Sequence, residues 1–126
     1  MNETESNGDI TRIQAYRDGT AVLLDRDDII RLYTENRKVY IITDEGKYES
    51  RQALYELEDN LDQSCFVRLS RFEIANLRRI FSFDLSIAGT IHVTYDNSDE
   101  TWVSRRYVKV IQEKINCLSK GGDGHE

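Results

Sequence analysis

The stretch Phe66-Val-Arg-Leu-Ser-Arg-Phe-Glu-Ile-Ala-Asn-Leu-Arg-Arg-Ile80 carries four arginines and one glutamate, a local charge of +3, in a chain of 126 residues whose net charge is −6. Residues 104–114 also carry +3. Because these two stretches together hold +6, the rest of the chain holds −12. This concentration predicts one positive face on an otherwise acidic molecule. A local positive face is what nucleic-acid binding needs, since contacts to phosphate are local and net charge is not.

The residues that follow this stretch have the pattern of β-strands. Residues 80–87 alternate between apolar and polar side chains, as a half-buried strand does. Two turns then return the chain through residues 90–95 and 101–103, so we expect a three-stranded antiparallel meander. The aromatic residues expected in its core are Phe81, Phe83 and Trp102.

Further strands are predicted nearer the N-terminus. They are residues 10–16, 20–24, 29–33, 38–43 and 47–49. The dipeptide Asp18-Gly19 between the first two favours a tight hairpin turn. Residues 34–37 are expected to connect the third strand to the fourth.

Two segments have helical periodicity. In the first, Ser50 is expected to cap a helix that runs to Leu61, with leucines at positions 54, 57 and 61 on one face. In the second, Ser104 is expected to cap the closing helix. Its apolar stripe is Val108, Ile111, Ile115 and Leu118. The fold class is therefore mainly β, with antiparallel strands and two short helices.

Length and composition indicate one domain, at residues 9–118, between flexible tails at 1–8 and 119–126. No apolar run is long enough for a membrane span, and the acidic N-terminus does not resemble a signal peptide. Cys65 and Cys117 have no ligand-like spacing and are expected to be reduced thiols. We therefore expect a cytoplasmic protein.

The sequence lacks the residue combinations that catalysis usually needs. The chain has two histidines, of which His92 lies within an alternating strand and His125 within the expected tail. No spacing typical of a phosphate-binding loop, a dinucleotide site or a zinc site is present. The acidic cluster at residues 25–28 is more typical of a turn than of a cation site. We expect no catalytic activity, no cofactor and no metal.

The stretch 66–76 resembles the signature of the LytTR DNA-binding domain, which occurs in bacterial response regulators. Val103-Ser-Arg-Arg-Tyr107 resembles the closing motif of the same family, and Asp27-Asp-Ile-Ile30 resembles the start of one of its strands. Asp44-Glu-Gly46, continued through Leu61, resembles a further family segment. The similarity extends over residues 10–118 and keeps the order of the motifs.

This resemblance implies small stacked sheets of antiparallel strands that present loops to successive grooves of a DNA duplex. It further implies a sequence-specific transcriptional regulator, or its DNA-binding domain, that recognises repeated half-sites, with a homodimer on DNA and a receiver domain or a membrane regulatory protein as partners. The residues expected to bind DNA are Arg37, Lys38, Ser70, Arg71, Arg105, Arg106 and Lys109. Arg71 and Arg106 are the candidates for contact with base edges, because a guanidinium can bind guanine with two hydrogen bonds.

Some residues depart from the family pattern or allow two interpretations. Ser70 replaces a usual histidine, and Phe72-Glu73 replaces a Ser-aromatic pair, with Glu73 adding a negative charge to the basic stretch. These departures favour an alternative, a protein-interaction module that has kept the fold and lost DNA binding. Arg68 either pins the loop through a carboxylate or contacts DNA. Arg78-Arg79 form either a solvated edge or a phosphate contact.

Overall fold

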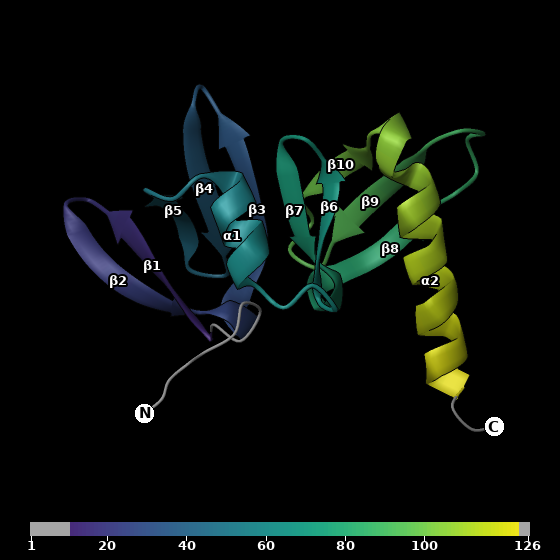
Figure 1. Ribbon diagram of the computed structural model, residues 1–126, viewed down its shortest axis with the longest axis horizontal. Helices are drawn as coiled ribbons and strands as arrows, with labels where there is room; N and C mark the ends of the chain where they lie inside the picture. The colour runs from purple at the N-terminus through teal and green to yellow at the C-terminus, as the bar shows by residue number, and fades with distance from the viewer. Residues whose placement is uncertain (1–10, 124–126) are drawn as a thin grey trace.

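A computed structural model describes residues 11–123, with side chains as far as Leu118 (Figure 1). The strands are β1 (Arg12–Arg17), β2 (Thr20–Asp25), β3 (Ile29–Glu35), β4 (Lys38–Thr43), β5 (Gly46–Ser50), β6 (Phe66–Ser70), β7 (Glu73–Asn76), β8 (Ile80–Asp84), β9 (Ile91–Tyr95) and β10 (Glu100–Val103). The helices are α1 (Leu54–Asn60) and α2 (Val108–Asp123), with short 3-10 turns η1 (Arg26–Asp28), η2 (Leu77–Arg79) and η3 (Arg105–Tyr107). The predicted tail at 1–8 lies outside the described residues, whereas α2 continues past Leu118 to Asp123. Neither helix is both long and apolar enough to cross a membrane.

The strands form two antiparallel sheets, as the fold class predicted. One has seven strands in the order β2-β1-β5-β4-β3-β7-β6, and the other has three in the order β10-β9-β8. Tight turns join neighbouring strands. Asp18 and Gly19 have φ of 51° and 78°, and Asn36 and Arg37 have φ of 52° and 68°. These angles are those of the two-residue turn that matches the twist of a hairpin. The second turn is shorter than predicted because β3 continues to Glu35.

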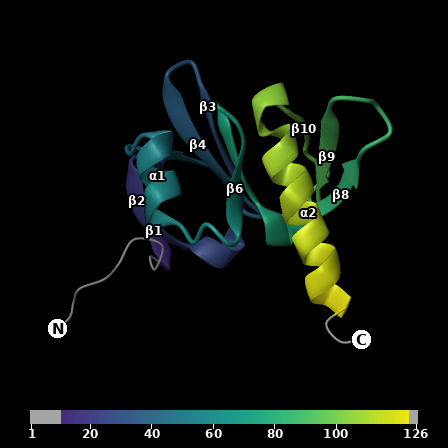
Figure 2. The same cartoon turned by 45° about the vertical axis from the view of Figure 1, so that its right-hand side comes forward.

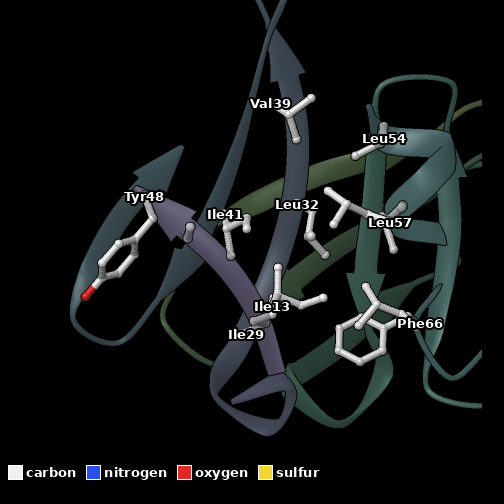
Figure 3. Close-up of a cluster of buried hydrophobic side chains, with 12 residues drawn as sticks. Ile13, Ile29, Leu32, Val39, Ile41, Tyr48, Leu54, Leu57 and Phe66 are labelled. Atoms are coloured by element: carbon white, nitrogen blue, oxygen red, sulfur yellow. The ribbon is translucent and has the colours of Figure 1, made fainter. Parts of the chain in front are cut away.

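Helix α1 covers one face of the large sheet and closes the first hydrophobic core. Leu54, Leu57 and Leu61 are all buried, as their spacing predicted. Figure 3 shows the side chains of Leu54 and Leu57 beside those of Leu32 and Phe66. The predicted cap at Ser50 is wrong. Ser50 ends β5, and the helix begins after Ala53, whose N–H donates to Glu56 Oε1 at 2.8 Å.

The second core lies between the β6–β7 hairpin, the small sheet and α2. Ile111 of α2 and Val93 of β9 are fully buried in it. Two aromatic residues predicted for this core are not there. Phe81 is 76% exposed, because a register shift in β8 between Ile80 and Ser82 leaves it outside the regular alternation. Trp102 is 50% exposed, because it pairs with His92 on the outer face of the small sheet.

Candidate nucleic-acid interface

Three segments that are distant in sequence lie along one end of the molecule. They are the β3–β4 turn, the β6–β7 turn and the start of α2, at the upper end in both Figure 1 and Figure 2. Two backbone hydrogen bonds join them. The N–H of Thr34 donates to the carbonyl of Phe72 at 2.9 Å, and the N–H of Ser104 donates to the carbonyl of Leu69 at 2.9 Å. The β6–β7 hairpin is therefore fixed against both neighbours.

Cationic side chains project from all three segments. We call this end the basic end and define it by Arg37, Lys38, Arg71, Arg105, Arg106 and Lys109, all of which are exposed. Lys38 lies 4.0 Å from Glu49, whereas the other five form no ion pair with a carboxylate of the described residues. The guanidiniums of Arg71 and Arg106 lie 5.4 and 5.5 Å from the ring centres of Phe72 and Tyr107. These charges are thus available to an anionic partner.

Arg68 holds the β6–β7 turn in place. Its Nε donates to Glu58 Oε1 at 3.0 Å, and its Nη1 donates to the carbonyls of Ser70 at 3.2 Å and Arg71 at 2.8 Å. The first of the two interpretations of Arg68, a loop pinned through a carboxylate, matches this geometry. The hydroxyl oxygen of Ser70 accepts from the N–H of Phe72 at 3.1 Å, which leaves the hydroxyl proton as the group that can reach a phosphate.

Glu73 is the residue whose role differs most from its sequence interpretation. It is 6% exposed and accepts three hydrogen bonds. The donors are Arg31 Nε at 2.9 Å, the Tyr95 hydroxyl at 2.7 Å and the Thr101 hydroxyl at 2.8 Å. Arg31 compensates its charge, so Glu73 does not present a negative charge at the basic end. It joins the large sheet to the small one.

The surroundings of Glu73 shift the pKa of two of its partners. Burial raises the pKa of the Tyr95 hydroxyl well above its usual value, and the neighbouring Glu73 carboxylate raises it further. Burial lowers the pKa of Arg31, but the carboxylates of Glu73 and Asp99 outweigh that effect and raise it overall. The phenol therefore remains a donor and the guanidinium remains charged throughout the physiological range.

The arginines at the end of the opening stretch lie far from Arg71. Strand β7 runs from the β6–β7 turn to η2, which places Arg78 and Arg79 at its opposite end. Arg79 pairs with Asp96 at 2.7 Å and with Asp44 at 2.9 Å, and Arg78 lies 3.9 Å from Asp27. Hydrogen bonds to Asp96 raise the pKa of Arg79. The single basic stretch of the sequence is thus split between two ends of the fold.

Acidic residues gather around η2. We call this the acidic end and define it by Asp25 at the end of β2, Asp27 and Asp28 in η1, Asp44 and Glu45 in the β4–β5 turn, and Asp96 in the β9–β10 turn. Strand β3 runs from η1 to the β3–β4 turn, so seven residues of extended chain separate the acidic end from the basic end. A strand of this length spans about 20 Å.

Two polar residues lie at the starts of the 3-10 turns η2 and η3. The side-chain oxygen of Asn76 accepts from the N–H of Arg78 at 3.0 Å, and its amide donates to the carbonyl of Ile29 at 2.8 Å, so Asn76 caps η2. Ser104 occupies the predicted position before η3, but its hydroxyl makes no capping hydrogen bond. Its carbonyl instead accepts from the N–H of Tyr107 at 2.8 Å.

Other kinds of site have less support. Among the side chains that the structure describes, no group of three or more His, Cys, Asp or Glu residues is arranged to hold a metal. A shallow pocket of about 360 Å³ lies beside the β1–β2 turn, between Tyr16, Tyr40 and Tyr48. Two arginines of this pocket stack on its tyrosines. The guanidinium carbon of Arg17 lies 4.0 Å from the ring centre of Tyr48, and that of Arg51 lies 3.8 Å from the ring centre of Tyr16.

Sequence reasoning missed the partners of Glu73. Arg31, Tyr95 and Thr101 come from three different strands, and no short-range pattern links them. The one indication was Glu73 itself, a carboxylate in an otherwise apolar and basic hairpin, since buried charges are usually paired.

A family model described as the LytTr DNA-binding domain matches residues 19–116 of the chain. A protein named "Uncharacterized HTH-type transcriptional regulator", from Staphylococcus aureus (strain NCTC 8325 / PS 47), is 34% identical over 101 residues, covering 80% of this chain and 68% of that protein. A regulator with the same description from strain MRSA252 is 33% identical over 101 residues.

The fold is also shared with a solved structure. The LytTr DNA-binding domain of a putative methyl-accepting/DNA response regulator from Bacillus cereus matches with a TM-score of 0.80 at 19% identity, covering 84% of this chain and 97% of that chain. In the described part of this chain, strands β6 to β10 separate α1 from α2, so the two helices are not consecutive elements. The basic end is formed by two strand turns and by the start of α2.

Proposed function

The chain belongs to the LytTR DNA-binding domain family, and we propose that it binds double-stranded DNA sequence-specifically as a bacterial transcriptional regulator or as the DNA-binding domain of one. One observation carries this proposal. Six cationic side chains from three separate segments gather at one end, and five of them form no ion pair with a carboxylate of the described residues. Such a distribution attracts phosphate to one end only.

The residues of the basic end have two kinds of role. Arg71 and Arg106 contact base edges, because each is exposed, carries a planar fork of donors and lies beside an aromatic ring that limits its motion. Arg37, Ser70, Arg105 and Lys109 contact phosphates and so fix the register of the protein on the duplex. Lys38 adds a positive charge beside Arg37.

The proposed partners are those that membership of the family implies. The protein recognises repeated half-sites, with two copies on one duplex, in the bacterial cytoplasm where the chromosomal DNA lies. Its activity is set by a receiver domain or by a membrane regulatory protein. The curated relatives are named as transcriptional regulators, which supports the regulatory part of the proposal.

The alternative, an interaction module without DNA binding, loses part of its basis. It depended on Ser70, Phe72 and Glu73. The charge of Glu73 is compensated by Arg31 at 2.9 Å, and Ser70 still has a hydroxyl that can donate. Of the three residues, the exposed Phe72 is the one that still favours the alternative.

The test is a selection of binding sites from random duplexes, followed by fluorescence anisotropy titration of the selected site at fixed salt. We expect Arg71→Ala and Arg106→Ala each to weaken binding by about 1–3 kcal/mol. Arg78→Ala is the matched control, since it removes an exposed arginine of the same stretch at the acidic end. It should leave the affinity unchanged or slightly lower, because the one lost positive charge lies far from the duplex.

Two results would contradict the proposal. One is a selection that yields no preferred sequence. The other is equal affinity of the wild type, Arg71→Ala and Arg106→Ala for the selected duplex. Thermal unfolding of each variant, followed by circular dichroism, shows whether a loss of binding arises from a loss of fold.

A further inference from the structure

Arg51 is an exposed cation beside the basic end, outside the three segments that define that end. It directly follows β5, and its guanidinium carbon lies 3.8 Å from the ring centre of Tyr16. It forms no ion pair with a carboxylate of the described residues. Its positive charge is therefore available to an anion, as the charges of the basic end are.

The strand register places Arg51 next to Lys38. Val39 of β4 pairs with Ser50 of β5. Because the two strands are antiparallel, the residue before Val39 and the residue after Ser50 are neighbours, and these are Lys38 and Arg51. Adjacent strands lie about 4.8 Å apart. Arg51 thus lies at the same end of the sheet as the β3–β4 turn.

The side chains of Arg51 and Lys38 also lie on the same face of the large sheet. Lys38 Nζ lies 4.0 Å from Glu49 Oε1, so the lysine side chain leans towards β5. Glu49 is paired with Tyr16 of β1, and Arg51 lies over the ring of this tyrosine. Paired residues point to the same side of a sheet, so one face carries both cations.

The backbone and the side chain of Arg51 are both held in place without a ligand. Ser50 Oγ accepts from the N–H of Gln52 at 3.0 Å, which closes a turn around Arg51. Stacking on Tyr16 limits the motion of the long side chain and uses the face of the guanidinium. The N–H groups at the guanidinium edge remain for hydrogen bonds, and little conformational freedom is lost when they bind a phosphate.

The order of the strands makes this position an extension of the basic end. In the large sheet β5 lies beside β4, whereas β7 and β6 lie beyond β3 on the other side (Figure 1). Arg51 is therefore on the side of the β3–β4 turn that faces away from the β6–β7 turn. A DNA duplex is stiff over about 50 nm, so a duplex that lies along the basic end continues past the β3–β4 turn. It carries one charge for about every 1.7 Å of its axis, which brings further phosphates close to Arg51.

We propose that Arg51 binds a backbone phosphate outside the segment that Arg71 and Arg106 contact, and that Tyr16 positions it for this contact. This inference rests on the proposed DNA binding and lengthens the interface by the end of β5. The contact carries no base information, because the phosphate is the same at every base pair. Tyr16 acts through Arg51 and is a positioning residue.

The experiment removes one negative charge of the DNA at a time. Each phosphate of the selected duplex and of its flanks is replaced in turn by an uncharged methylphosphonate. Affinity is measured by fluorescence anisotropy for the wild type and for Arg51→Gln. At one flanking phosphate we expect the replacement to weaken wild-type binding as much as Arg51→Gln weakens binding to the unmodified duplex. Combining the two changes should cause no further loss, because both remove the same contact.

The dependence on salt gives the size of the effect. One phosphate contact contributes about 0.9 to the slope of log affinity against log salt concentration. The loss of affinity in Arg51→Gln should therefore be about 3.5-fold larger at 50 mM than at 200 mM salt. The preferred sequence should not change.

Arg17→Gln is the matched control. The Arg17 guanidinium also stacks on a tyrosine of the large sheet, at 4.0 Å from the ring centre of Tyr48. Its Nη1 donates to the carbonyl of Glu45 at 2.8 Å, and Glu45 belongs to the acidic end. The control removes the same charge and the same kind of stacking as Arg51→Gln. It should leave the affinity and the salt slope nearly unchanged.

Tyr16→Leu tests the positioning role. It keeps the charge of Arg51 and removes the ring on which the guanidinium stacks. We expect part of the loss seen for Arg51→Gln, with the salt slope of the wild type. The double variant should bind no more weakly than Arg51→Gln alone, because Tyr16 has no effect once the arginine is absent. A double variant that binds more weakly would overturn the positioning role.

The outcomes separate this inference from the proposed function. Equal affinity of the wild type and Arg51→Gln for the selected duplex at every salt concentration would overturn the phosphate contact and leave the proposed function intact. A loss that does not depend on salt and that adds to the loss at every methylphosphonate would overturn it as well. A changed preferred sequence would make Arg51 a reader of bases and would also overturn it. Failure to select any preferred duplex would overturn both proposals. Circular dichroism should show the wild-type unfolding temperature for Arg51→Gln, whose side chain is exposed.

Discussion

At the scale of single residues, Glu73 shows how burial changes the meaning of a charge. A carboxylate near phosphate would oppose DNA binding. In the fold it accepts from Arg31, Tyr95 and Thr101 and lies out of solvent, so its charge is compensated locally. The same contacts connect β7 to the small sheet, and the β6–β7 turn depends on them for its position.

Tyr95→Phe tests this network. The substitution removes the hydroxyl that donates to Glu73 at 2.7 Å and leaves the buried ring. A hydrogen bond to a charged group contributes about 1.5–3 kcal/mol, so we expect the free energy of unfolding in urea to fall by that amount at pH 7. Tyr55→Phe, at an exposed position on α1, is the matched control and should change it by less than about 0.5 kcal/mol.

The same variant predicts a pH dependence. Burial raises the pKa of Tyr95 in the folded state above the unfolded value. The folded protein thus holds this proton more tightly, so the stabilisation is complete below about pH 10 and is lost as pH rises through the folded-state pKa. Unfolding measured between pH 8 and pH 11 should show a smaller decline for Tyr95→Phe than for the wild type. Parallel curves would contradict the assignment.

At the scale of elements, the β3–β4 turn combines strain with charge. Arg37 has a φ of 68°, a region that glycine occupies far more easily. The sequence keeps an arginine where glycine would relieve the backbone. A strained residue retained at an exposed turn suggests that its side chain is needed.

Arg37→Gly should therefore have opposite effects on stability and on binding. We expect the free energy of unfolding to stay constant or to rise by up to about 1 kcal/mol, because the left-handed conformation is no longer strained. We expect the affinity for the selected duplex to fall by about 1 kcal/mol, because a phosphate contact is lost.

The control for this turn is Asp18→Gly, which makes the same backbone change at a φ of 51° in the β1–β2 turn. It should affect stability in the same way without weakening DNA binding. If Arg37→Gly binds as tightly as the wild type, Arg37 does not contact the duplex.

At the scale of the whole molecule, the fold separates its charges. Strands β3 and β7 each run between the basic end and the acidic end, so these two groups of side chains lie at opposite ends of the same strands. A net charge of −6 then repels DNA from most orientations and favours approach by the basic end. Weak non-specific binding is the expected consequence.

This separation predicts a measurable dependence on salt. The logarithm of the affinity should fall linearly with the logarithm of salt concentration, and each phosphate contact contributes about 0.9 to the slope. Lys109→Gln should reduce the slope by about one without changing the preferred sequence. Lys114→Gln, further along the same helix where its Nζ donates to the carbonyl of Gln63 at 3.4 Å, should leave the slope unchanged. Equal slopes for both variants would remove Lys109 from the interface.

What the sequence determined by itself is local. The hairpin turn at Asp18-Gly19 and the leucine stripe of α1 follow from backbone preference and from periodicity, which act over a few residues. The motif order identified the family, and with it the three segments that meet at the basic end. The turn, the stripe and each single motif are encoded by residues close together in the chain.

The tertiary structure decided which charges are free. In the fold, Arg71 lies at one end of β7 and Arg79 lies beyond the other end, where it pairs with Asp96. Glu73 pairs with Arg31, which comes from a different strand. The fold also leaves Trp102 half exposed on the outer face of the small sheet. Burial and pairing depend on groups that fold together from distant positions, and the free energy of a charge depends on those groups rather than on its neighbours in sequence.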